Sequence, residues 1–388
     1  MTTVWRRYLF VGLLAVGVDL LLPVGLGRDL VCSLIAASGA AAIWQSVRLN
    51  RPDYPSVWYL LAVGMASWAV GMALYSGYKH DSPISTFPSL ADVAYIASYP
   101  LLVAALMMFA RSRGRESRPT ALLDSAILTL GVGLLSSVFL IQPIWAADGE
   151  PTLSRLVALA YPLGNVLLFG ALARLANAPG PGRTVSRLLA ASVGAMLVVQ
   201  SVANAVTAAP MIDTHSSSVD PTWVVFFVLA GAAALHPSTG VLSAPAAAPD
   251  ETMHAGRIFV FVGAVMIGPA ILLGELIAGI PLDTWVVMIA STLMVLLILA
   301  RMIRMVRQLQ EQAELLVQLA DTDPLTGLPN RRALSAQVHA RLATPGRFWA
   351  LLLLDLDKFK AVNARLGHHF LDHPLSPGGT LPRRPPRH

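Results

Sequence analysis

The chain has 388 residues, of which 55% are hydrophobic and only 13% are charged, and its formal net charge is +6. Soluble domains carry about 25% charged residues, so this composition argues against a soluble protein and indicates a membrane protein. The single cysteine, Cys32, excludes an internal disulfide. The arginines stand beside apolar stretches, which favours a lipid surface over nucleic acid as their partner.

Ten apolar stretches are candidates for membrane spans, because a bilayer core of about 30 Å needs roughly 20 apolar residues per helix. The first is interpreted as an uncleaved span, since no small-residue cleavage site follows it. The eighth is short. The ten lie at about 8–26, 30–47, 57–76, 92–110, 120–142, 153–174, 186–208, 222–236, 257–279 and 284–302. They predict a mostly α, polytopic helical bundle over residues 1–300.

The distribution of basic residues supports an even number of spans. With ten spans and a cytoplasmic N-terminus, fifteen arginines fall on the cytoplasmic side, and only Arg28, Lys79 and Arg155 fall outside. Cytoplasmic loops of membrane proteins are enriched in Arg and Lys. Both the N- and the C-terminus are therefore predicted to be cytoplasmic.

Two of the stretches resemble each other. Residues 98–111 and 160–174 both begin Tyr-Pro-Leu after one residue and end Ala-Arg, and both run from outside to inside in this topology. A duplicated helix pair explains the likeness. The alternative is that any span prefers tyrosine near the interface and arginine at its inner end.

Polar side chains within the spans are candidates for a sensor site, because such groups are costly in a membrane. Asp19 lies in the first span, Asn165 in the sixth and Glu275 in the ninth. A ligand pocket can be built from any of them. The alternative is that each hydrogen-bonds between helices or reaches an interface.

Residues 301–322, which come after the last span, predict a further helix that leads to the C-terminal segment. Apolar or neutral residues recur at 302, 305, 309, 312, 316 and 319, with the alternating spacing of a coiled-coil seam. This pattern favours a homodimer through 302–319. The alternative is a single amphipathic helix on the membrane surface, which Arg301, Arg304 and Arg307 would suit.

Two motifs follow this helix. The first is DTDPLTGLPNRRAL (321–334), and the second, after an apolar run, is LDLDKFKAVNARLGHH (354–369). Together, in this order, they resemble the GGDEF family, the diguanylate cyclases, over about 323–372. The resemblance implies an α/β domain that joins two GTP molecules into cyclic di-GMP with Mg²⁺. It also implies a bacterial protein, so the predicted location is the cytoplasmic (inner) membrane.

The resemblance assigns a metal and phosphate site to the second motif. Asp355 and the main-chain carbonyl of Leu356 would bind Mg²⁺, a hard cation that prefers oxygen ligands. The main chain around Lys358 and Phe359 would approach the phosphates of GTP.

The resemblance also assigns guanine recognition and a structural turn. Asn363 matches the family's guanine-binding asparagine, and Asp372 stands where the family has a guanine-binding aspartate. In the first motif, Asp323 and Arg331 are expected to pair within the turn that joins the signalling helix to the domain.

The resemblance breaks after about residue 370. Leu371 replaces the glycine of the family pattern, and Pro374 interrupts the helix expected there. The Gly-Gly-Asp/Glu-Glu-Phe turn, whose acid completes the metal site, does not occur in the 388 residues. The tail 373–388 is rich in proline and arginine, which suggests a frameshift, and 323–388 is expected to be poorly ordered.

These observations predict a membrane-bound protein of the diguanylate cyclase type that is inactive as written. Its parts are a multi-span sensor (1–300), a signalling helix (301–322), the first part of a GGDEF-type domain (323–372) and the tail (373–388). One alternative is a catalytically dead sensor or dimerisation protein. A less favoured alternative is a transporter.

Overall fold

The computed structural model describes residues 3–23, 25–81, 87–112, 119–146, 149, 151–177, 183–208, 220–239, 255–278, 284–323, 326–343 and 350–352. The chain forms two compact units, Met1–Arg301 and Met302–His388. The described residues are mostly α, as the sequence predicts. They contain no sheet, only an isolated bridge between Thr322 and Pro329.

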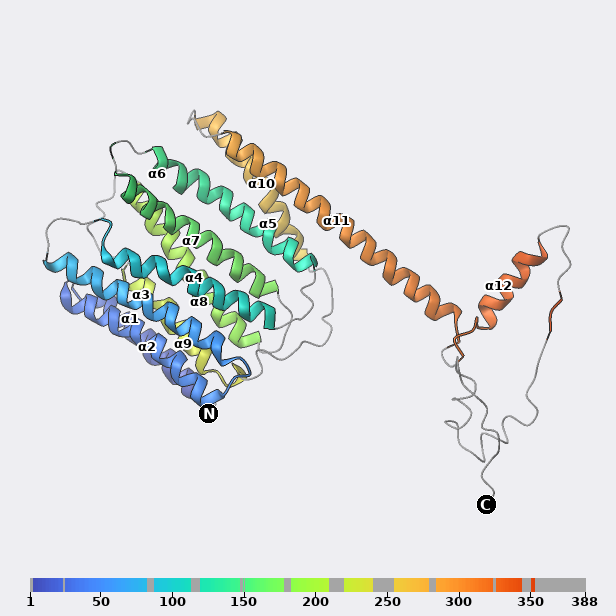
Figure 1. Ribbon diagram of the computed structural model, residues 1–388, viewed down its shortest axis with the longest axis horizontal. Coiled ribbons are helices and arrows are strands. Elements are labelled where there is room, and N and C mark those ends of the chain that lie inside the picture. The colour runs from blue at the N-terminus through green and yellow to red at the C-terminus, as the bar shows by residue number, and fades with distance from the viewer. Residues whose placement is uncertain are drawn as a thin grey trace, which may run out of the picture. The chain divides into compact units, whose positions relative to one another are not determined.

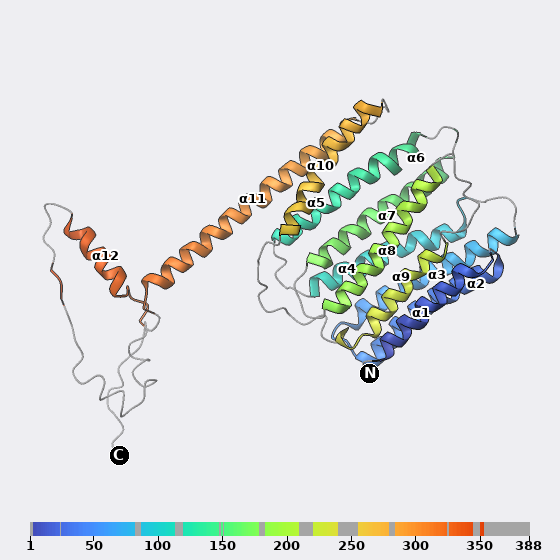
Figure 2. The same ribbon diagram turned by 180° about the vertical axis from the view of Figure 1, so that it is seen from behind.

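The first unit is a helical bundle (Figures 1 and 2). Its α-helices are α1 (Val4–Leu21), α2 (Leu26–Asn50), α3 (Pro55–Asp81), α4 (Leu90–Ser112), α5 (Pro119–Ser136), α6 (Gln142–Ala146), α7 (Thr152–Asn177), α8 (Arg183–Ala208), α9 (Asp220–Leu235) and α10 (Ala255–Ala278). A π-helical turn, η1 (Ser137–Ile141), joins α5 to α6, and a 3-10 turn, η2 (Pro237–Thr239), follows α9. The helix α11 (Thr284–Asp321) begins in this unit and ends in the second, which also holds α12 (Arg331–Leu342).

Each predicted span coincides with helix, but length and composition alone qualify fewer of them. Among the described residues, six helices are long and apolar enough to cross a membrane: Leu26–Asn50, Pro55–Tyr78, Leu90–Ser112, Ala121–Ala146, Thr152–Ala176 and Thr284–Asp321. The 18 residues of α1 include Arg6, Arg7 and Asp19, which lowers its hydropathy. These helices fit a membrane protein, and the count of ten spans stays a prediction.

The main core lies where α2, α3, α4, α7, α8 and α9 meet. The short helix α9 contacts α1, α2 and α8, and most of its side chains are buried, because it is apolar on every face. Gly39 on α2 permits a close approach of two helix backbones: a Cβ atom there would lie 2.8 Å from the carbonyl oxygen of Phe227 on α9. Only glycine allows the two backbones to come so near.

The helices α5, α10 and α11 form a smaller assembly next to this core. Two apolar clusters hold it: Leu134, Val138, Ile271 and Val287 form one, and Ile127, Ala264 and Met294 form the other. The apolar part of α11 is otherwise little buried. The predicted last span and the predicted signalling helix are one continuous helix in the structure.

Candidate functional site

The residues that the resemblance assigns to metal and nucleotide lie outside the described residues. They are Asp355, Leu356, Lys358, Phe359, Asn363 and Asp372. Within the described part of the chain, no group of three or more His, Cys, Asp or Glu side chains is placed to hold a metal ion. Within the GGDEF-type segment (323–372), the structure describes residues 323, 326–343 and 350–352, which include part of the turn between α11 and α12 and α12 itself.

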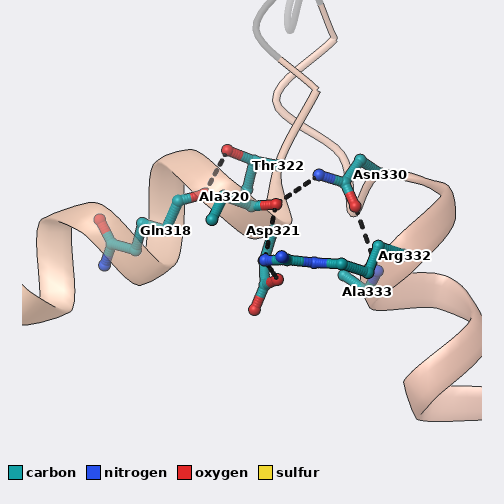
Figure 3. Close-up of polar contacts among 7 residues, drawn as sticks. All are labelled: Gln318, Ala320, Asp321, Thr322, Asn330, Arg332 and Ala333. Atoms are coloured by element: carbon teal, nitrogen blue, oxygen red, sulfur yellow. Dashed lines mark hydrogen bonds and ion pairs between the residues drawn. The ribbon is translucent and has the colours of Figure 1, made fainter.

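This turn caps both of its helices with one asparagine (Figure 3). The Oδ1 atom of Asn330 accepts a hydrogen bond from the Ala333 N–H at 3.1 Å and so caps the N-terminus of α12. The Nδ2 atom of the same side chain donates to the Ala320 carbonyl, 2.7 Å away, in the last turn of α11. Carbonyls at a helix C-terminus have no partner within the helix, so Asn330 satisfies groups of both helices at once.

An ion pair strengthens the same junction. The guanidinium of Arg332 lies 2.8 Å from the Asp321 carboxylate and also donates to the Ala320 carbonyl at 3.1 Å (Figure 3). A cation at this place complements the negative end of the α11 dipole. Both side chains are exposed, at 70% and 43%, so the pair itself adds little stability.

Between the two helices the chain closes a tight loop. The Oδ1 atom of Asp323 accepts hydrogen bonds from the N–H of Thr326 at 2.9 Å and from its hydroxyl at 3.0 Å. Gly327 adopts a φ of 68°, a conformation that favours glycine. The side chain of Asp323 therefore binds Thr326, the residue before the glycine of this turn. Arg331 is exposed as the first residue of α12, and its pairing with Asp323 stays a prediction.

The sequence reasoning missed Asn330, Arg332 and Asp321 as the residues that link the helices. A signal for Asn330 was present, because asparagine before a helix is a strong N-cap residue. No local signal identifies Ala320 as the acceptor of Arg332. The ion pair depends on how the turn folds.

In the membrane unit, Asp19 is fully buried and has partners on α2. Its Oδ2 atom accepts a hydrogen bond from the Cys32 thiol at 3.1 Å and lies 3.8 Å from Nε of Arg28. Arg28 is itself 6% exposed. A buried charge is tolerated when it is paired, so this arrangement supports the structural alternative for Asp19.

Asn165 takes part in a contact between α4 and α7, the two helices that carry the Tyr-Pro-Leu sequence. The Tyr99 hydroxyl on α4 donates to Oδ1 of Asn165 at 2.9 Å, and the Tyr161 hydroxyl on α7 donates to Oδ1 of Asp92 at 2.5 Å. Each helix thus supplies a tyrosine to a polar group of the other. Gly164 makes room for the Tyr99 ring, since a Cβ atom there would lie 2.6 Å from two ring carbons.

Aromatic rings surround this contact. Trp68 on α3 packs against Tyr95, Tyr99 and Trp223, with ring centroids 5.4, 5.6 and 5.7 Å apart. Such edge-on and tilted arrangements are favourable for aromatic pairs. Asp19 and Asn165 therefore belong to separate contacts, on α1–α2 and on α4–α7. Glu275 lies on α10, and its side chain is outside the described part of the structure.

A further ion pair ties α5 to α11. Nε of Arg301 donates to Oδ1 of Asp124, and the two side chains are 13% and 5% exposed. Arg301 is the last residue of the first unit. The two residues are 177 positions apart in the sequence.

Comparison with known proteins identifies the C-terminal segment. The family model described as diguanylate cyclase, GGDEF domain, matches residues 320–378. Over 52 residues the chain is 58% identical to the uncharacterized protein Rv1354c of Mycobacterium tuberculosis (strain H37Rv), and over 54 residues it is 50% identical to the diguanylate cyclase DgcP of Pseudomonas aeruginosa (strain PAO1).

Each of these matches covers 13% of this chain and 8% of the relative. No solved structure matches the chain significantly. The matched segment includes the turn that joins α11 to α12 and the second motif. Residues 320–378 of the chain therefore match the GGDEF domain, and the chain spans only a small part of the length of the relatives that it matches.

Proposed function

We propose that the protein is a membrane-bound signalling protein of the diguanylate cyclase type, located in the bacterial cytoplasmic membrane. The observation that carries this proposal is the continuity of α11. One helix of 38 residues begins among the apolar helices of the bundle and ends at the first residues of the GGDEF segment. The turn at Asn330 then fixes the start of α12 to the end of that helix.

The chemistry of this family requires two GTP molecules and Mg²⁺. A 3′-hydroxyl attacks an α-phosphate, and pyrophosphate leaves; such transfers depend on positioning and on stabilisation of negative charge. In this chain the proposed metal ligands are Asp355 and the carbonyl of Leu356. The main chain at Lys358 and Phe359 would lie near the phosphates, and Asn363 and Asp372 would bind guanine. The Mg²⁺ ion would supply the charge stabilisation.

We expect that the 388 residues alone do not make cyclic di-GMP. They contain Asp355 but no Gly-Gly-Asp/Glu-Glu-Phe turn, whose acid would complete the metal site. The alternative of an inactive sensor or dimerisation protein is therefore kept as the second candidate function. In both cases the membrane unit would act on the C-terminal segment through α11.

The proposal includes a homodimer through residues 302–319. Within this segment Met302, Leu309, Leu316 and Leu319 are exposed at 46 to 67% and recur at coiled-coil spacing. Burying a leucine or methionine side chain is worth about 1.5–3 kcal/mol, so a second copy of the same helix is a stabilising partner. Two GTP molecules also have to meet in one reaction, which a dimer of GTP-binding domains would bring about.

Accessibility of single cysteines tests the proposed orientation. In a Cys32→Ser background, Ser335→Cys on α12 should react with a membrane-impermeant maleimide only after the inner membrane is opened. Thr152→Cys, at the predicted outer end of α7, is the matched control and should react in intact cells. Labelling of Ser335→Cys in intact cells would place the GGDEF segment away from cytoplasmic GTP and contradict the proposal.

A further inference from the structure

One face of α11 packs against the bundle. Val287 and Met294 are buried, at 0% and 3% exposure, in the two clusters with α5 and α10. Ser291 lies against Gly268 of α10, and Ile298 packs on the cluster around Ile127. The spacing from 287 through 291, 294 and 298 to 301 is four, three, four and three residues.

The proposed dimer seam follows directly along the helix. Its positions are 302, 305, 309, 312, 316 and 319, which are three, four, three, four and three residues apart. With 100° of rotation per residue, the mean directions of the bundle-facing stripe and of the seam differ by only about 10°. The two sets of residues therefore lie on one side of one helix. On the opposite side, Leu296 is 56% exposed.

Two partners cannot occupy this face at the same height. Packed helices lie about 8–10 Å apart, so a second α11 at positions 287–298 would take the place of α5 and α10. The bundle and a second copy of the chain thus compete for α11. Arg301 with Asp124 stands where the buried, bundle-facing stripe ends and the exposed stripe begins.

We infer that the Asp124–Arg301 ion pair sets the border between the part of α11 that packs on the bundle and the part that forms a coiled coil with a second copy of the chain. This inference rests on the proposed homodimer. The pair suits a border for an electrostatic reason. If the seam extended past residue 301 toward residue 284, Arg301 of one copy would approach Arg301 of the other copy. These like charges repel each other. Holding Arg301 on Asp124 prevents that approach.

The arrangement gives the membrane unit a way to act on the C-terminal segment. A change in the bundle that loosens α5 from α11 moves the border along α11 toward residue 284 and lengthens the segment that pairs with the second copy. A change that tightens the contact between α5 and α11 shortens the paired segment. The helix α11 is continuous to Asp321, where Asn330 binds its last turn. A change in the length of the paired segment can therefore be transmitted along one helix to the GGDEF segment.

Disulfide crosslinking in membranes tests this inference on the full chain. In a Cys32→Ser background, Leu309→Cys reports the seam, Ile298→Cys the bundle-facing stripe and Leu296→Cys the opposite side. The expected result is fast dimer formation at 309 and slow formation at 298 and 296. Adding Asp124→Asn should raise the rate at 298 about tenfold, within the 5- to 150-fold range of coupling between sites, and leave the rates at 309 and 296 unchanged.

Two further variants separate an effect of charge from misfolding. The charge exchange Asp124→Arg with Arg301→Asp restores the pair and should return the rate at 298 to the slow value, and Asp124→Glu should keep it slow. If 309 does not crosslink in the intact chain, the homodimer fails and the inference falls with it. The homodimer stands but the border is refuted in two cases. In one, cysteine at 298 crosslinks as fast as cysteine at 309 in the intact chain. In the other, crosslinking at 298 stays slow in the Asp124→Asn variant.

Discussion

The contact between the two Tyr-Pro-Leu helices predicts a measurable loss of stability on Tyr161→Phe. The Tyr161 hydroxyl donates to Asp92 at 2.5 Å, and Asp92 is 9% exposed. The other carboxylate oxygen of Asp92 accepts from the N–H of Ser89 at 2.7 Å and from its hydroxyl at 2.9 Å. A hydrogen bond to a charged group contributes about 1.5–3 kcal/mol. Since Asp92 keeps two donors, we expect a loss of about 1.5–2 kcal/mol.

The loss can be measured as the free energy of unfolding of the membrane unit in mixed micelles. Tyr54→Phe is the matched control, because Tyr54 is 50% exposed and should change stability by less than about 0.5 kcal/mol. A double-mutant cycle with Asp92→Ala isolates the pair and should give a coupling energy of at least about 1 kcal/mol. Additive effects, or a Tyr161→Phe value no larger than that of Tyr54→Phe, would refute the reasoning.

Three further predictions concern packing, capping and pH. Gly164→Ala should cost about 1–3 kcal/mol by overpacking, whereas Gly194→Ala, with nothing within 4 Å, should be neutral or stabilising; the same unfolding assay compares them. Asn330→Ala removes the N-cap of α12 and should cost that helix about 0.5–2 kcal/mol, seen as faster amide hydrogen exchange over 331–342. Burial and nearby Arg6 lower the pKa of His236, so the folded state favours its neutral form. The contribution of neutral His236 to the free energy of unfolding should be fully present above a pH of about 6.5 and should be lost as the pH falls below this value. His236→Gln should weaken the dependence of the free energy of unfolding on pH in that acidic range.

The positions of the helices could be predicted from the sequence because they depend on local properties. In a membrane, the backbone hydrogen bonds of a long apolar run must be satisfied within the segment, which a helix does. Each predicted apolar run accordingly coincides with a helix in the structure. The helices that contain residues 98–111 and 160–174, α4 and α7, pack together, and the duplication of a helix pair stays a prediction. The last span and the signalling helix were predicted as two elements, and the structure joins them in one helix, α11.

The partners of the polar side chains could not be predicted in this way. Periodicity shows which face of a helix a residue occupies but gives no information about the facing helix. Asp92 and Tyr161 are 69 positions apart, and Asp124 and Arg301 are 177 apart. For the same reason the contacts of Asp19 with Arg28 and Cys32 on α2 could not be predicted, and its role in a sensor site stays a prediction. The motif at 321–334 was recognisable, but the role of Asn330 between two helices depends on the folded turn.

The central proposal is that this chain holds the first part of a diguanylate cyclase site, with Asp355 as a metal ligand, and that the 388 residues alone are inactive. It is tested most directly by measuring cyclic di-GMP made from GTP and Mg²⁺ by membranes that contain the protein. We would compare the 388-residue chain with residues 1–370 joined to the part of the DgcP domain that follows its matched stretch. The account predicts no product from the former, product from the latter, and loss of that product in Asp355→Ala. A joined chain that inserts at the same level and makes none, or that keeps its activity in Asp355→Ala, would contradict the account.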